Sequence, residues 1–232
     1  MNIALIMNDN SYAGREYLSK LISDEIRLDV ILIGSFPAFD KNENERCGGL
    51  WNPPRQDILL RNFNFYRFKS LKSLKLENLL LLKNYDLGIQ GGTGILKNNI
   101  INKFKKGFIN FHPGDLPNYR GCSAPEWQLY EDNDIVSTCH LIDEGIDSGP
   151  ILAKQKLSFE YNNYYEFRSK IYIETSVFVL NIVNKIINNG EMLESEIQNE
   201  KHSKYRIYIG EKRINELKKR IINRKNKNSI RI

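Results

Sequence analysis

Apolar runs and amphipathic segments alternate along the first half of the chain. Residues 1–7 and 28–34 are apolar runs of the kind that form strands buried on both faces. Between them, residues 12–22 place apolar side chains at helical spacing. The alternation continues with predicted strands at 64–68, 87–90 and 107–111 and predicted helices at 71–82 and 95–104. This pattern is typical of an α/β fold with a doubly wound, mostly parallel sheet, in which ligands bind beyond the carboxyl ends of the strands.

The pattern changes near residue 150. A predicted helix at 124–130, opened by a capping box of Ser123 and Glu126, and a strand at 135–142 come before the change. A strand at 151–159, a long helix at 164–188, a short strand at 205–209 and a helix at 214–222 follow. We therefore expect a core of residues 1–157 and a small carboxyl-terminal extension of helix and strand at 158–232. Residues 35–57 form an irregular stretch, and loops of that length are usually functional or mobile.

The composition is that of an ordinary globular protein, with 232 residues, of which 41% are hydrophobic and 27% charged. Its three cysteines (Cys47, Cys122 and Cys139) show no paired spacing, which argues against a disulfide framework and against a metal site. No apolar run reaches the ~18 residues of a membrane span, and residues 1–10 do not read as a signal peptide. We therefore expect a cytoplasmic protein without a membrane span.

The net charge of +6 is concentrated at the end of the chain. Residues 212–232 hold nine basic side chains and one acidic side chain, so the rest of the chain is slightly acidic. A general basic surface, the usual mark of a nucleic-acid-binding protein, is therefore missing. The basic segment is compatible with RNA, an anionic membrane or a phosphorylated ligand, but we interpret it as a solvated terminus.

Candidate catalytic side chains follow the predicted strand at 107–111. Asn110 and His112 are two residues apart, so in a strand they project to the same side at its carboxyl end. An amide can donate to a developing oxyanion, and an imidazole can move a proton near neutral pH. This pair therefore suits acyl transfer.

A turn with three acids, at 142–150, follows the predicted strand at 135–142. One of its carboxylates (Asp143, Glu144 or Asp147) can accept from His112 and stabilise the charged imidazole. Spacing alone does not choose among the acids. A surface histidine and a solvated turn remain the plain alternative.

Both segments together closely resemble the folate-dependent formyltransferase family. The first has the family's N-x-H-P-x-x-L-P-x-Y-x-G pattern, in Asn110, His112, Pro113, Leu116, Pro117, Tyr119 and Gly121. The second has its D-x-G-x-D-x-G-P-I turn, in Asp143, Gly145, Asp147, Gly149, Pro150 and Ile151. The resemblance is strong over residues 86–156 and weak after about 158.

That resemblance implies a Rossmann-like core, a catalytic triad of Asn110, His112 and Asp147, and 10-formyltetrahydrofolate as formyl donor without a metal. It also implies that the folate contacts two loops, at 90–96 and 142–145. The expected folate-binding residues are Gln90, Gly91, Gly92, Ile95, Leu96, Ile142, Asp143, Glu144 and Gly145. In the implied reaction a primary amine attacks the formyl carbon while Asn110 and His112 stabilise the oxyanion. His112, oriented by Asp147, helps to relay the proton.

Among the acceptors used in this family, a nucleotide-linked amino sugar fits the sequence best. Initiator-tRNA formyltransferases carry a second RNA-binding domain, for which about 75 residues of extension leave little room. Glycinamide ribonucleotide formyltransferases have a glycine-rich phosphate loop after the first strand, whereas residues 8–14 here contain one glycine. We therefore expect a dTDP-linked sugar, such as dTDP-4-amino-4,6-dideoxyglucose, a role in surface polysaccharide synthesis, and a homodimer formed through the extension.

The residues that contact the sugar nucleotide are harder to choose. Trp51 and Tyr165 are candidates to stack on the base, Arg55 is a candidate to bind the pyrophosphate, and Arg120 is a candidate near the sugar.

Two other functions stay open. One is a hydrolase that releases formate from the same folate, and the other is a non-catalytic binding protein on the same fold.

Overall fold

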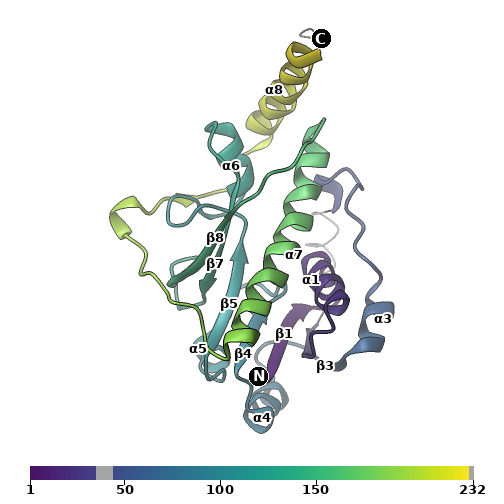
Figure 1. Cartoon of the computed structure of the whole chain (residues 1–232), viewed down its shortest axis with the longest axis vertical. Helices are drawn as coiled ribbons and strands as arrows, with labels where there is room; N and C mark the ends of the chain where they lie inside the picture. The colour runs from purple at the N-terminus through teal and green to yellow at the C-terminus, as the bar shows by residue number, and fades with distance from the viewer. Residues whose placement is uncertain (35–43, 230–232) are drawn as a thin grey trace.

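The computed structural model describes residues 1–34 and 44–229, and side chains up to residue 223. Its centre is a seven-stranded sheet (Figure 1). From one edge to the other, the strands are β3 (Asn64–Phe68), β2 (Asp29–Ile33), β1 (Ile3–Asn8), β4 (Leu87–Gln90), β5 (Gly107–His112), β7 (Val136–Leu141) and β8 (Ile151–Lys156). The five strands from β3 to β5 are parallel, and β7 and β8 are antiparallel. The predicted doubly wound, mostly parallel fold is confirmed.

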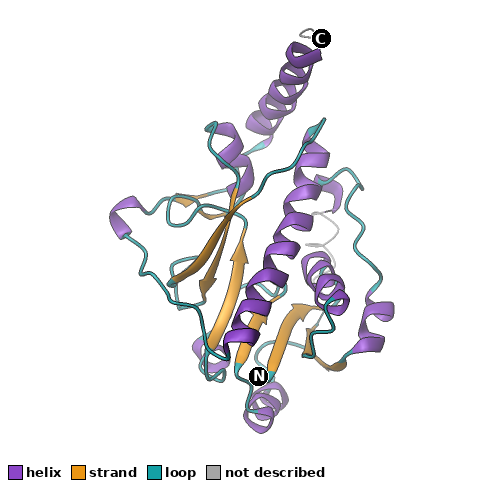
Figure 2. Ribbon diagram, in the orientation of Figure 1, coloured by secondary structure: helices purple, strands orange, loops and turns teal. Residues whose placement is uncertain are grey.

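Helices cover both faces of this sheet, as Figure 2 shows. On one face, α1 (Tyr12–Ser23) and α7 (Tyr164–Asn189) pack Leu18, Leu21, Val179 and Ile182 against β1, β2 and β5. On the other, α4 (Leu74–Lys83) and α5 (Asn98–Ile101) pack Leu76, Leu80 and Ile100 against Ala4, Ile6 and Ile31. Successive residues of β1 and β2 thus enter opposite core layers, because side chains alternate across a strand.

The extension returns to the core. After α7, Glu196 pairs with Ile151 at the start of the edge strand β8, and β9 (Tyr205–Arg206) pairs in parallel with β6 (Arg120–Gly121) in the loop after β5. Next, α8 (Glu211–Ser229) packs Ile214, Leu217 and Ile221 with Leu129 of α6 (Ala124–Tyr130) and Phe167 of α7. The last turns of α8 point away from the body of the molecule (Figure 1).

Most predicted elements are present with small shifts, and three details differ. The predicted helix at 95–104 is reduced to α5, and the strand at 205–209 to the two residues of β9. The predicted helix at 214–222 is longer, since α8 starts earlier and continues into the basic segment. Residues 35–43 of the predicted irregular stretch and 230–232 of the basic segment lie outside the described residues.

The predicted capping box at α6 is wrong. Ser123 has a left-handed backbone conformation, with φ of 54°, and its side chain makes no capping hydrogen bond. Glu126 is instead fully buried, where it accepts from Arg168 at 2.8 Å, Arg46 at 3.1 Å and the Tyr164 hydroxyl at 2.9 Å. The carboxylate therefore joins α6 to α7.

None of the helices formed by the described residues is long and apolar enough to cross a membrane. A short 3₁₀ turn follows α3 (Gln56–Leu59), and another occupies Glu200–His202.

Candidate functional site

A cavity of about 330 Å³ opens beyond the carboxyl ends of β1, β4 and β5. This is where a parallel sheet places ligands. Its walls come from the first turn of α1, the loop after β4, the end of β5, the turn after β7 and the middle of α7. The lining includes Ser11, Tyr12, Gln90, Asn110, His140, Asp147, Tyr172 and Thr175.

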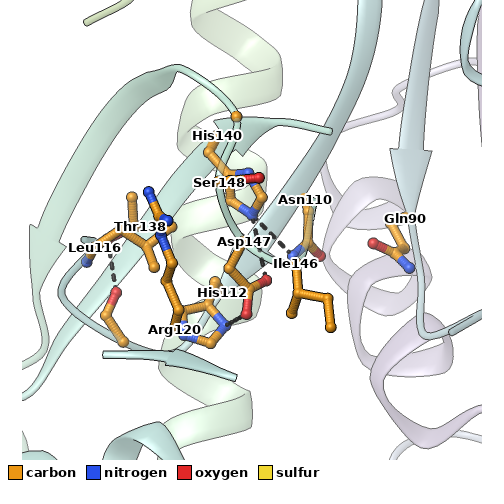
Figure 3. A network of polar contacts seen from close by, with 12 residues as sticks. Gln90, Asn110, His112, Leu116, Arg120, Thr138, His140, Ile146, Asp147 and Ser148 are labelled. Atoms are coloured by element: carbon orange, nitrogen blue, oxygen red, sulfur yellow. Dashed lines mark hydrogen bonds and ion pairs between the residues drawn. The ribbon is translucent and has the colours of Figure 1, made fainter. Parts of the chain in front are cut away.

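Asn110 and His112 stand on alternate positions of β5, as predicted, but they meet different surroundings. The Asn110 side chain lines the cavity, and its Nδ2 lies 3.1 Å from Nε2 of His140 on the neighbouring β7. Asn110 and His140 are direct partners in the register of β5 and β7. Figure 3 shows Asn110, His140 and Asp147 pointing toward one another, with Gln90 apart from them on β4.

His112 is held between two hydrogen-bond acceptors. Its Nε2 lies 2.6 Å from the carbonyl oxygen of Tyr119, and its Nδ1 lies 3.5 Å from Oδ2 of Asp147. A carbonyl oxygen only accepts, so Nε2 carries a hydrogen and donates it. The Nδ1 side of the ring faces the Asp147 carboxylate, so both ring nitrogens lie next to acceptors, and the residue is 6% exposed.

Asp147 is placed by the backbone of its turn. Its φ of 52° is a left-handed conformation, unusual for a residue with a side chain. Its Oδ2 accepts from the Gly121 amide at 2.8 Å, and its Oδ1 lies 3.7 Å from Nε2 of His140. Asp143, the rival carboxylate, instead accepts from Ser148 Oγ and the Gly145 amide within the turn. The structure therefore puts Asp147 beside His112, whereas Asp143 braces the turn.

His140 has a defined tautomer. Its Nδ1 lies 2.8 Å from the Leu141 carbonyl oxygen, so Nδ1 carries the hydrogen and Nε2 accepts from the Asn110 amide. Burial lowers the pKa of His140, and the nearby His112 adds to this, while Asp147 acts in the opposite direction. His140 is therefore a neutral acceptor that fixes which way the Asn110 amide points.

Most of the expected folate-binding residues surround the same cavity. Seven of the nine line it, namely Gln90, Gly92, Ile95, Leu96, Ile142, Asp143 and Gly145. Gly91 instead packs against α1, where an added Cβ would lie 2.9 Å from Leu5 and 3.2 Å from Gly14. Glu144 is exposed and accepts a hydrogen bond from Asn98. The binding roles themselves remain predictions.

The four candidates for sugar-nucleotide contact lie in separate places. Trp51 forms a wall of the cavity but is 2% exposed, stacks on Tyr172 at 3.8 Å between ring centroids, and donates to Glu16. Tyr165 packs beside Gly48 and accepts from Lys218, away from the cavity lining. Neither ring presents a free face to the cavity floor in the way that base stacking requires.

The two candidate arginines lie in different surroundings. Arg55 is 77% exposed, pairs with Asp57, and borders a depression next to the cavity rather than the cavity itself. Arg120 is 1% exposed, and its guanidinium donates to Gln198 and Glu200 of the extension. Arg120 therefore joins two parts of the chain and has no free donor edge facing the cavity.

Sequence reasoning missed several residues of the site. Tyr172 and Thr175 line the cavity from α7, inside what the sequence presents only as a long amphipathic helix. Gln198 is a single polar residue in an aperiodic segment, and no motif marks it.

Within the described residues, no group of three or more His, Cys, Asp or Glu side chains is arranged to hold a metal ion.

The chain matches known proteins over most of its length. The family model described as formyl transferase matches residues 1–164. Methionyl-tRNA formyltransferase of Buchnera aphidicola is 26% identical over 212 residues, which cover 90% of this chain and 66% of that protein. The chain spans 30% to 45% of several other methionyl-tRNA formyltransferases that it matches.

Solved structures show the same fold at low sequence identity. A sugar N-formyltransferase from Shewanella is 18% identical, with a TM-score of 0.62 over 95% of this chain and 88% of that one. An N-formyltransferase from Helicobacter canadensis, in complex with folinic acid and dTDP-3-aminofucose, is 20% identical, with a TM-score of 0.58 over 89% of this chain and 71% of that one. On the match to residues 1–164, this chain belongs to the formyl transferase family.

Proposed function

We propose that this protein is a folate-dependent N-formyltransferase, which moves a formyl group from 10-formyltetrahydrofolate to a primary amine. The observation that carries the proposal is the convergence of Asn110, His112 and Asp147 at a cavity beyond the strand ends, in a chain of the formyl transferase family. A non-catalytic protein would have no need to keep an amide, an imidazole and a carboxylate in such contact.

The cavity suits a folate. Ile95, Leu96 and Ile142 offer apolar surface for a flat ring, and the loops after β4 and β7 offer backbone donors and acceptors for its polar edge. When bound there, the folate supplies the activated formyl group. These loops would hold its pterin, and the reacting end would lie toward Asn110 and Asp147.

Asn110 is placed to stabilise the oxyanion that forms when the amine attacks the formyl carbon. One hydrogen of its amide is directed to His140, which leaves the other free to donate into the cavity. Fixed donors of this kind lower the barrier because they need no reorientation as charge develops. His140 thus sets the direction of the donor before the reaction starts.

Asp147 is placed to handle the proton. Asp147 and Asn110 line the cavity, whereas both nitrogens of His112 face acceptors. We therefore assign transfer of the amine proton toward the leaving folate nitrogen to Asp147, directly or through water. His112 lies beside Asp147 and holds its carboxylate in place. This differs from the relay expected from the sequence, in which His112 moves the proton.

For the acceptor, we propose a nucleotide-linked amino sugar. A depression next to the cavity is bordered by Arg15, Arg55, Arg61 and Arg67, with Asp9 and Asp57 as the nearby acids. Arg15 lies over the ring of Tyr12, which lines the cavity, at 4.4 Å. An amine in the cavity can therefore be linked to a diphosphate that meets these guanidinium groups. The fit to a sugar N-formyltransferase over most of both chains supports this acceptor.

An initiator methionyl-tRNA is the second candidate, because methionyl-tRNA formyltransferases are among the curated relatives that match. The test is a panel of acceptors incubated with 10-formyltetrahydrofolate: dTDP- and UDP-linked 3- and 4-amino sugars, glycinamide ribonucleotide and methionyl-tRNA. Mass spectrometry of each acceptor should find a formamide on a sugar nucleotide alone. Formylation of the tRNA alone would contradict the sugar proposal, and formate without any formylated amine would indicate a hydrolase.

A further inference from the structure

The catalytic turn is held by the carboxyl-terminal extension at one side chain. Gln198, which is 5% exposed, reaches under the turn that carries Asp147. Its Nε2 donates to the carbonyl oxygens of Asp147 at 2.9 Å and Gly149 at 2.7 Å. Its Oε1 accepts from Nε and Nη2 of Arg120 at 3.1 and 2.7 Å. The two donor hydrogens and two acceptor positions of the amide are thus all used.

This orientation of the amide is determined by its partners. A guanidinium only donates and a carbonyl oxygen only accepts, so a flipped amide would place donor against donor and acceptor against acceptor. Arg120 is itself buried, and its Nε and Nη2 hold the Gln198 oxygen in place, while Glu200 accepts from Nη1 and Nη2 of the same guanidinium. Gln198 therefore links the loop after β5, the turn after β7 and the extension through one fixed group.

Asp147 needs such a support because of its backbone. A left-handed conformation is uncommon at a residue with a Cβ, and neighbouring contacts help to impose it at Asp147. The same extension steadies the other contact of Asp147. Gly121, whose amide binds the Asp147 carboxylate, lies in β6, which pairs with β9.

We propose that Gln198 is a positioning residue for catalysis, which holds the main chain of Asp147 so that its carboxylate stays against His112. The proposal rests on the proposed role of Asp147 in formyl transfer. It also means that residues 1–164, which match the family model, do not complete the site by themselves. The segment from Gln198 to Arg206 supplies the support from outside that match.

Two variants separate positioning from general stability. Gln198→Met removes all four hydrogen bonds at similar volume. Gln198→Glu still accepts hydrogen bonds from Arg120, but its second carboxylate oxygen faces two carbonyl oxygens. Only the two hydrogen bonds to the turn, at Asp147 and Gly149, are therefore lost. Glu200→Gln is the matched control, since it changes the other partner of Arg120 and leaves the turn untouched.

The kinetic test uses the full chain and the best amine of the acceptor panel. Both Gln198 variants should lower kcat about 10- to 100-fold with KM for the amine within about twofold, because a displaced catalytic group slows chemistry more than binding. Glu200→Gln should stay within about twofold of the unmodified protein. In an Asp147→Asn background, Gln198→Met should cost almost nothing more. The proposal would be overturned if Gln198→Met lowered kcat as much in the Asp147→Asn background as in the unmodified protein. It would also be overturned if Gln198→Glu kept the full kcat.

A second readout does not depend on activity. The amide of Gly121 donates to Asp147, so its hydrogen-exchange rate, measured by NMR, reports whether the carboxylate is in place. Exchange should accelerate at least about tenfold in Gln198→Glu and remain unchanged in Glu200→Gln. Unchanged exchange in Gln198→Glu would refute the positioning role even if the protein forms no formamide. Faster exchange in a protein that forms none would support the positioning role and refute only the proposed activity.

Discussion

At the scale of single residues, the partners of a side chain decide its role more than its type does. His112 and His140 lie on adjacent strands, yet His112 faces two acceptors whereas His140 accepts from Asn110. Arg120, beside the sequence motif that marks the site, is buried against Gln198. The motif therefore identifies the reacting groups, but the contacts of each one come from segments far away in the sequence.

The triad variants test the proposed roles directly. Asn110→Ala removes the oxyanion donor and should lower kcat by roughly 10²- to 10³-fold. Asp147→Asn keeps the shape of the side chain but loses the base, and should cost at least about 10²-fold. Steady-state kinetics with 10-formyltetrahydrofolate measures both. Asp143→Asn is the comparison variant, because Asp143 also lines the cavity but accepts hydrogen bonds within its own turn. A larger loss in Asp143→Asn than in Asp147→Asn would exchange their roles.

His140 should make the fold sensitive to acid. Its folded-state pKa is lowered by burial, so the unfolded chain binds the proton more readily and stability falls as pH drops below about 6.5. The titratable groups that face it are Asp147, His112 and Asp143. Urea denaturation between pH 8 and pH 5 should therefore show a smaller loss for His140→Gln, which retains an acceptor for Asn110 without titrating. If the free energy of unfolding falls with pH equally steeply in His140→Gln and in the unmodified protein, the assignment of His140 as a buried, neutral side chain is contradicted.

At the scale of elements, the pattern of apolar residues predicts what local burial controls. The bounds of β3, β4 and α6 are those expected from the sequence. In β4 the cause is local burial, whereas β3 is a largely exposed edge strand that its run of aromatic residues marks. The capping box at Ser123 was wrong because Glu126 finds Arg168 and Tyr164 across the interior instead. Gln198 could not be predicted, because its importance depends entirely on which turn it lies beneath.

Gly149 is the most restrictive position of the catalytic turn. A Cβ added there would lie 1.9 Å from the Leu141 carbonyl oxygen, which is backbone and cannot move aside cheaply. Gly149→Ala should therefore displace the turn, lower stability by more than about 2 kcal/mol and abolish transfer. In the control Gly210→Ala, nothing lies near the added Cβ and only the φ of 82° opposes it, so about 1 kcal/mol is expected. Equal urea midpoints of unfolding for Gly149→Ala and Gly210→Ala would contradict this ranking.

At the scale of the whole molecule, the extension has two parts with different tasks. Residues 196–206 complete the catalytic end of the sheet, and α8 covers the cluster around Phe167 before its end leaves the body (Figure 1). The predicted homodimer would use this extension, and light scattering of the purified protein tests it. The division of the chain near residue 157 stays a prediction, and the sequence did not indicate that Gln198 contacts the turn that carries Asp147.

Two truncations test that description of α8. Removing residues 225–232 should leave transfer unchanged, because among the side chains described for α8, which end at residue 223, the buried ones are Ile214, Leu217 and Ile221. Removing residues 213–232 exposes the cluster with Leu129 and Phe167, and should cause aggregation in size-exclusion chromatography. If the shorter truncation raises KM several-fold and salt enlarges the effect, the basic segment binds the phosphates of the substrate and is no mere solvated terminus.

The central claim is that the cavity beside Asp147 transfers a formyl group to an amine. The most direct measurement supplies 10-formyltetrahydrofolate with an isotopic label in the formyl carbon, together with the acceptor panel, and follows the label by mass spectrometry. The label should appear in the formamide of a sugar nucleotide with the unmodified protein and with Glu200→Gln, and should be nearly absent with Asp147→Asn. Label found only in free formate, or transferred equally well by Asp147→Asn, would contradict the account.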